Sequence, residues 1–176
     1  MTATALAAVG SNANENGTLL ISGTAVTLTN QTAPELSTTI PSWVKRITVI
    51  FNGISQSSSS PFGIVQIGSG SYSTSGYVNT ASLVTSSAAT SVTSITTGFI
   101  IYWTGAASDT ASGHLVLTLI SGNSWVASGV IANSGTARIL TTAGNITLGG
   151  VLDRIRLTTQ DGTTQYDAGT VNIFWE

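Results

Sequence analysis

The segment Ile47-Thr48-Val49-Ile50-Phe51 decides the fold class, because apolar side chains occupy its first, third and fifth positions. A period of two is the signature of a β-strand, whose successive side chains point to opposite faces. The same period recurs in residues 115–119 and in residues 171–175. The alternation therefore predicts a protein built from β-strands.

Residues that form turns divide the chain at regular intervals. Glycine, serine, threonine and asparagine recur about every eight to twelve residues, which is the strand spacing of β-sandwiches and β-barrels. The sequence contains 19 glycines, 24 serines and 29 threonines. We predict an all-β fold, an antiparallel, jelly-roll-like β-sandwich of two packed sheets. The expected strands span residues 18–22, 24–29, 44–52, 62–67, 72–78, 94–103, 114–121, 124–131, 137–140, 151–159, 163–166 and 170–175.

Two dipeptides predict tight turns between these strands. Asp161-Gly162 separates two strand-like runs and predicts a β-hairpin, because both residues tolerate a positive φ. For the same reason, Asn52-Gly53 predicts the end of the first long strand.

Charge is scarce for a soluble domain. Charged residues make up 7% of the 176 residues, whereas about 25% is usual. The hydrophobic share of 41% excludes a disordered chain. The net charge of −2 excludes a basic surface for nucleic acid or anionic lipid. The longest strongly apolar run, residues 99–103, is far shorter than the roughly 20 residues of a membrane-spanning helix. We therefore expect neither a nucleic-acid nor a membrane partner.

The first 17 residues differ from the rest. Residues 1–9 are rich in alanine and threonine, and residues 10–17 are polar. Two interpretations stay open: a frayed terminus, or an arm that becomes ordered when it docks on a partner. We predict that residues 1–17 form a flexible arm and that residues 18–176 form one sandwich domain.

Few side chains are suited to catalysis. The sequence has one histidine, His114, and no cysteine, and it lacks a Gly-x-Ser-x-Gly motif. A single histidine cannot build a multi-histidine metal site. Asp161 and Asp167 are either a pair of glycosidase-like carboxylates or two turn-forming residues. We predict that the protein is not an enzyme and that it uses no cofactor and no metal.

The charged stretch around Arg154 and Arg156 is unusual in this sequence. On a β-strand the two arginines share one face, and Asp153, Ile155 and Leu157 lie on the other. Arginine favours bidentate carboxylate partners, so the pair predicts fixed ion pairs. The stretch is either a solvated strand face or an anchor for another subunit or a ligand.

Two of the four tryptophans, Trp43 and Trp175, are further candidates for contacts between subunits. With so few charges, the surface must include much serine, threonine, glycine and apolar area. A monomer with this surface tends to associate. A homo-oligomer resolves the problem by burying one face of each sandwich. We expect a homotrimer.

Four parts of the sequence resemble a known module: residues 18–24 (TLLISGT), 40–55 (IPSWVKRITVIFNGIS), 152–157 (LDRIRL) and 166–176 (YDAGTVNIFWE). They are similar to a β-sandwich module of tailed-bacteriophage virion proteins, which often ends longer tail-fibre-like chains. The resemblance extends over residues 17–176. It implies a non-enzymatic structural role on the virion, commonly as a trimer. Only about 16 residues precede the sandwich, which favours a small module fixed directly to a capsid or tail surface.

Two functional hypotheses follow from the resemblance. In the first, the protein is a trimeric, head-fibre-like module that decorates the capsid surface and docks through its N-terminal arm. In the second, it is the receptor-binding tip of a short tail fibre and contacts a glycan or protein on the host surface. Loops at the end of a sandwich are the usual place for recognition. The expected recognition residues are Ser57, Ser58, Pro61, Tyr72 and Tyr77.

Overall fold

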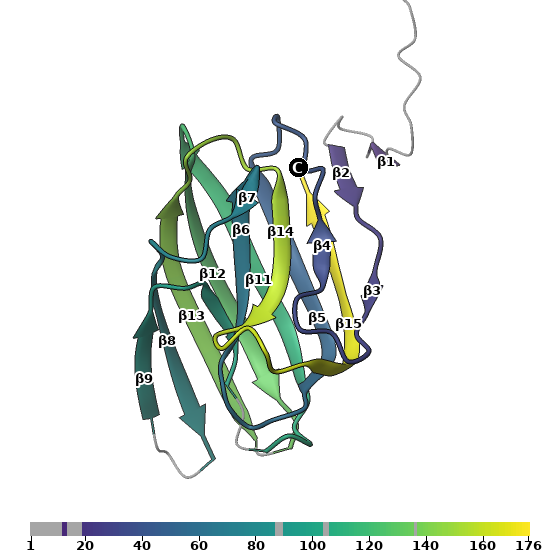
Figure 1. Cartoon of the computed structure of the whole chain (residues 1–176), viewed down its shortest axis with the longest axis vertical. Helices are drawn as coiled ribbons and strands as arrows, with labels where there is room; N and C mark the ends of the chain where they lie inside the picture. Colours follow the sequence, from purple (N-terminus) through teal and green to yellow (C-terminus); the bar gives the residue numbers. More distant parts are fainter. Residues whose placement is uncertain (1–11, 14–18, 87–89, 104–105, 136) are drawn as a thin grey trace, which may run out of the picture.

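The computed structural model describes residues 12–13, 19–86, 90–103, 106–135 and 137–176 (Figure 1). The regular secondary structure of these residues is entirely β, as the alternation predicts. No helix among them is long and apolar enough to cross a bilayer. The strands are β1 (Asn12–Ala13), β2 (Leu19–Ser22), β3 (Val26–Thr27), β4 (Glu35–Ser37), β5 (Arg46–Gln56), β6 (Gly63–Ser69), β7 (Ser71–Tyr72), β8 (Val78–Thr85), β9 (Thr90–Ile95), β10 (Phe99–Tyr102), β11 (Ala111–Ser121), β12 (Ser124–Asn133), β13 (Arg138–Thr147), β14 (Arg154–Thr159) and β15 (Tyr166–Trp175).

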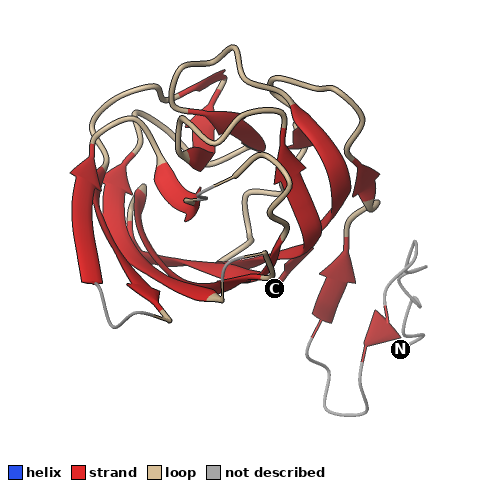
Figure 2. Ribbon diagram, turned by 90° about the horizontal axis from the view of Figure 1, so that it is seen from below, coloured by secondary structure: helices blue, strands red, loops and turns tan. Residues whose placement is uncertain are grey.

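Two antiparallel sheets pack as a sandwich. Within the described residues, the larger sheet has the order β1-β2-β15-β5-β11-β12-β13-β8-β9, and β3 also pairs with β15. The smaller sheet has the order β10-β6-β14-β4, and β7 pairs with β6. Figure 2 shows that the larger sheet is curved and that the smaller sheet covers its hollow side. The smaller sheet does not cover the opposite, outer side of the larger sheet.

The core lies between the two sheets, where the alternating apolar positions meet. Ile47, Val49 and Phe51 of β5 are all buried, and so are Ile155 and Leu157 of β14. These side chains belong to one continuous cluster of buried residues. The period of two in the sequence therefore identifies the inward face of each central strand.

Strand β8 is absent from the strands that the sequence periodicity predicts. Its inward positions are Asn79, Ala81 and Leu83, and only one of them is a large apolar residue. The expected strand over residues 72–78 corresponds to the short β7 and a loop. The expected strand over residues 94–103 is divided between β9 and β10, which belong to different sheets. The side-chain pattern of such short segments does not indicate where the chain leaves one sheet and enters the other.

Both turn predictions need correction. Asp161-Gly162 does not close a hairpin, because β14 before it and β15 after it belong to different sheets. Gly53 does adopt a positive φ of 61°. It lies inside β5, however, where the pairing with β11 and with β15 shifts register, so it belongs to a β-bulge.

Most of the expected N-terminal arm lies outside the described residues. The exception is β1, which pairs with β2 in the register Asn12 with Leu20 and Ala13 with Leu19. Strand β2 in turn pairs with the end of β15.

Candidate functional site

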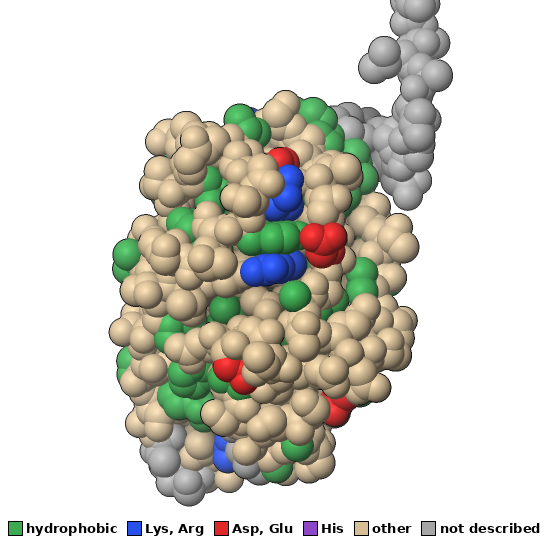
Figure 3. All heavy atoms as spheres, viewed as in Figure 1, with side chains coloured by type: hydrophobic (Ala, Val, Ile, Leu, Met, Phe, Trp, Pro, Cys, Tyr) green, Lys and Arg blue, Asp and Glu red, His purple; other side chains and the backbone are tan. Residues whose placement is uncertain are grey.

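The outer face of the smaller sheet gathers charged side chains, as the blue and red atoms in Figure 3 show, and Tyr72 lies among them. Alternation along β14 buries Ile155 and Leu157 and turns Arg154 and Arg156 outward. The ring of Tyr72, from β7, lies close to both arginines. The guanidinium carbons are 5.7 Å (Arg154) and 4.3 Å (Arg156) from the ring centroid. Cations at this distance from an aromatic ring are attracted to it.

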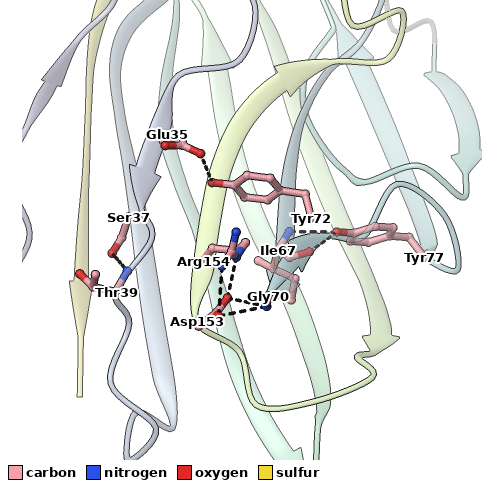
Figure 4. Close-up of polar contacts among 9 residues, drawn as sticks. All are labelled: Glu35, Ser37, Thr39, Ile67, Gly70, Tyr72, Tyr77, Asp153 and Arg154. Atoms are coloured by element: carbon pink, nitrogen blue, oxygen red, sulfur yellow. Dashed lines mark hydrogen bonds and ion pairs between the residues drawn. The ribbon is translucent and has the colours of Figure 1, made fainter.

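Each member of this group has a further partner, several of which appear in Figure 4. The Tyr72 hydroxyl donates to Glu35 Oε1 (3.0 Å), from β4. Arg154 Nε and Nη2 donate to the two oxygens of Asp153 (2.7 and 3.3 Å). The Gly70 amide donates to the same carboxylate at 3.0 and 3.2 Å. We name Glu35, Tyr72, Asp153, Arg154 and Arg156 the Tyr72 cluster.

Arg156 takes an amide partner instead of a carboxylate. Its Nε and Nη2 donate to Gln66 Oε1 at 2.9 and 2.7 Å. Gln66 lies on β6, directly opposite Arg156 in the ladder. The Gln66 Nε2 donates in turn to the Thr97 carbonyl (2.7 Å). Arg156 is thus connected through Gln66 to the turn before β10.

Arg154 forms the predicted ion pair, and its partner is Asp153. The prediction that Asp153 lies on the strand face opposite the arginines was wrong. Asp153 precedes β14 instead of facing inward from it, so its carboxylate is free to reach Arg154. The hydrogen bond and the charge of Arg154, together with the Gly70 amide, lower the pKa of Asp153. The glutamate and glutamine that complete the network were not predicted, because they are far from Arg156 in sequence.

The Tyr72 cluster joins three chain segments that backbone pairing does not fully connect. Tyr72 belongs to β7, which pairs only with β6 among the described strands. Its contacts with Glu35 and with the arginines connect β7 to β4 and β14. The Tyr72 cluster therefore holds β4, β7 and β14 together over the outer face of the smaller sheet through hydrogen bonds and ring contacts within the chain.

We predict that Tyr72 ionises about two pH units above an ordinary tyrosine. Partial burial, the Glu35 hydrogen bond and the Glu35 charge raise its pKa from 10.0 to about 12, against the opposing charge of the arginines. Because the pKa of Tyr72 is raised in the folded state, the protonated phenol stabilises the fold. This contribution to the free energy of unfolding is complete below about pH 10 and is lost as the pH rises towards 12. The ultraviolet difference titration of the wild type against Tyr72→Phe measures this ionisation directly.

A matched variant tests the cause of the shift. Glu35→Gln removes the carboxylate charge and should move the ionisation of Tyr72 back towards pH 10. Ionisation near pH 10 in the wild type would show that the phenol does not hold its place beside Glu35 in solution.

The two candidate tryptophans lie at the end of the sandwich where the chain terminates. Trp43 precedes β5 and is 44% exposed. Trp175 pairs with Ile47 and packs against the core. Its Nε1 is buried without a hydrogen-bond partner among the described residues. Trp43 is therefore available for an external contact, whereas most of Trp175 serves the fold.

A small pocket lies next to the loop that carries Trp43. Its volume is about 100 Å³, and its walls include Ile40, Val44, Asn123, Trp125 and Leu152. Trp125 belongs to β12, and the other four residues come from the loops before β5, between β11 and β12, and before β14. The pocket combines apolar walls with a few polar groups.

The predicted recognition loops do not form one surface. Ser57, Ser58 and Pro61 precede the start of β6, whereas Tyr72 follows its end. The two loops therefore lie at opposite ends of that strand.

Tyr77 also does not fit the predicted role. It is buried, and its hydroxyl accepts from the Ile67 amide (2.9 Å) and lies 3.1 Å from the Ser73 carbonyl oxygen. Burial raises its pKa to about 12. Tyr77 supports the loop from inside and is not exposed for contact with a receptor.

Asp161 is used as a turn residue. Its carboxylate accepts hydrogen bonds from the amides of Thr163 and Thr164 and from the Thr159 hydroxyl. Partial desolvation raises its pKa, but these bonds outweigh desolvation and hold the pKa well below its usual range. The turn-forming interpretation therefore accounts for Asp161. No group of three or more histidine, aspartate or glutamate side chains within the described segments is placed to hold a metal ion.

Comparisons with known proteins do not identify a family for this chain, so the role of the site is argued from its geometry. A scan against protein-family models found no match, and a search of the curated proteins found no similar sequence.

Proposed function

We propose that this chain is a non-enzymatic structural protein of a tailed-bacteriophage virion. In this proposal it is a homotrimeric, jelly-roll-like module that decorates the capsid surface and docks through its N-terminal arm. The proposal starts from the resemblance of residues 40–55, 152–157 and 166–176 to a virion β-sandwich module.

The observation that supports the proposal is the place of these residues in the fold. Strand β5 lies within residues 40–55, apart from its last residue, and β15 within residues 166–176. The two strands are neighbours and pair from Tyr166 with Gln56 to Trp175 with Ile47. Residues 152–157 include the first four residues of β14, a central strand of the opposite sheet. The segments that carry the resemblance thus form one connected framework, as expected if they define a shared fold.

Long, regular ladders also suit a rigid building block. Strands β12 and β13 pair without interruption from Ser124 with Thr147 to Asn133 with Arg138. The residues of such a ladder open together as a cooperative unit and not one by one, which favours a constant shape. A repeated shell component needs this constancy, because every copy must present the same contacts to its neighbours.

Deletion of residues 1–16 tests the docking role of the arm. The deletion removes β1, which pairs only with β2 among the described strands, at the edge of the larger sheet. The core contains no residue before Leu28 in the described part of the chain. We therefore expect an unchanged thermal unfolding midpoint and the loss of the protein from purified virions. A chain with the same sixteen residues in scrambled order is the matched control and should also be lost.

Immunogold labelling of the virions tests the location. Labelling on the capsid, together with loss of the truncated chain, is the expected result. Normal incorporation of the folded, truncated chain would contradict the docking role. Absence of the full-length chain from purified virions would contradict the virion assignment itself.

The second candidate function is a receptor-binding tip of a short tail fibre. The exposed Trp43 beside the small pocket favours it, because exposed tryptophan faces stack on sugar rings. The same labelling experiment separates the two candidates, since gold would then mark the tail. Purified protein would also block adsorption of the virus to its host, and Trp43→Ala would weaken that block.

A further inference from the structure

The outer side of the larger sheet carries most of the exposed apolar side chains. Residues opposite one another in the ladders form rows across the sheet, and one row runs Ile50, His114, Val130 and Thr141. All four of these side chains are exposed. We name the outward positions of β5, β11, β12, β13, β8 and β9 the outer face. Its exposed large apolar side chains are Ile50, Val78, Val84, Val92, Ile120, Val126, Val130 and Ile139.

The outer face is almost without charge. All six of its strands are fully described, and their outward positions carry two ionisable side chains, Arg46 and His114. Arg46 lies at one end, where its Nη1 is 3.3 Å from Glu176 Oε1. The other outward residues are mainly serine, threonine, alanine, valine and isoleucine. The solvent face of an antiparallel sheet is usually polar, and charges on it normally oppose association.

The outer face is large enough for a stable interface. Strands lie about 4.8 Å apart and rise about 3.3 Å per residue, so six strands of up to eleven residues cover about 800 Å². A standard interface buries about 800 Å² on each partner. The contact would therefore require most of this face and not a small part of it.

We propose that the outer face is the surface through which one copy of this chain contacts a second copy. The inference rests on the proposed homo-oligomeric module and names the surface that such a module buries. When two copies of this almost uncharged face meet, burial of their methyl groups is favourable, and their hydroxyl groups can pair with one another across the contact.

Charge complementarity favours a second copy over a different protein. An ordinary surface in which about 25% of residues are charged would bury ions opposite valine and threonine side chains that cannot pair with them. Unpaired buried ions strongly oppose association. A second copy brings Arg46, which is already paired with Glu176 at one end of the face, and His114, whose neighbours on both adjacent strands, Ile50 and Val130, are uncharged.

Substitution of Val130 by lysine tests the surface. Val130 is 46% exposed and central in the outer face, so a lysine there would bury an unpaired charge in an interface between copies. We expect multi-angle light scattering to show an oligomer for the wild type. For Val130→Lys, self-association should be at least about a hundredfold weaker. The matched control is Val151→Lys, which adds the same charge at an exposed position in the loop before β14, outside the outer face.

The controls separate the possible outcomes. Thr141→Lys makes the same change from a residue that is already polar and exposed, and it should dissociate the oligomer if Val130→Lys does not fold. An oligomer that survives folded Val130→Lys and Thr141→Lys would overturn the surface and leave the virion assignment standing. Dissociation by Val151→Lys would overturn it as well. A wild type that is monomeric at about 10 µM would overturn the proposal that the outer face contacts a second copy. The virion experiments described above would then still test the virion role separately.

Discussion

Asn79→Ala should lower the free energy of unfolding by about 3 kcal/mol or more, because it leaves several buried polar groups without partners. Asn79 faces the core from β8 and is buried. Its Nδ2 donates to Thr142 Oγ1 (2.9 Å) and to the Ala143 carbonyl (3.0 Å), both on β13. Its Oδ1 accepts from the amide of Ile100 on β10 (3.0 Å). The side chain therefore connects the larger sheet to the edge strand of the smaller sheet.

The expected loss depends mainly on the groups that stay behind. Ile100 is fully buried, so its amide cannot turn to water when the Asn79 oxygen is removed. An unpaired buried donor or acceptor costs about 1–3 kcal/mol, and the alanine leaves more than one. The free space left by the amide adds to this cost.

Urea unfolding of Asn79→Ala measures the effect against a matched control. Asn145→Ala removes an asparagine from the exposed side of β13, and its effect should remain within about 0.5 kcal/mol. A loss of less than about 1 kcal/mol for Asn79→Ala would show that the two sheets do not depend on this connection.

Gly169→Ala is the second substitution for which we expect a large effect, with a loss of about 2–5 kcal/mol. Gly169 lies in β15 at the bulge opposite Gly53 and has a φ of 98°. A Cβ atom at this position would lie 2.5 Å from both the Gly53 carbonyl oxygen and the Ile54 Cα. These are backbone atoms, so they cannot turn aside as a flexible side chain would. The β5–β15 pairing must open locally to accept the methyl group.

Gly162→Ala separates the two causes of strain. Gly162 also has a positive φ, 69°, but a Cβ atom there would meet no atom within 4 Å. Its loss should be limited to about 1–2 kcal/mol, the usual cost of a left-handed conformation. Equal losses for the two variants would show that backbone contact at the bulge adds nothing. Thermal or urea unfolding of both proteins gives the comparison.

The outcome for individual elements shows how far local patterns predict this fold. Alternation in β5 and in the other long strands predicts both the all-β class and the inward side chains, because burial of one face requires apolar residues at every second position. Alternation does not reveal β8, whose inward positions begin with Asn79 and Ala81. An asparagine is suitable for the core only because Ile100 and Thr142 lie beside it, and neither is near it in sequence.

The candidate site divides in the same way. Alternation predicts that Arg154 and Arg156 share one outward face, and the structure confirms it. Their aromatic neighbour is about 80 residues away in the chain and reaches them through the pairing of β6 with β7 and β14. Tyr77 resembles Tyr72 in sequence context, yet it is buried. Whether a tyrosine in a loop is exposed depends on which other segments pack over it, and those segments are distant in the sequence.

The sequence by itself determined the class of fold, the inward faces of the long strands and the scarcity of charge, because each of these depends on residue types and their local period. Only the tertiary structure decided which strands are neighbours. A turn such as Asp161-Gly162 sets its own dihedral angles, but whether the chain pairs with the preceding strand or crosses to the other sheet depends on what both surfaces bury. For the same reason, only the folded chain brings valines of several strands together on one outer face that is almost without charge.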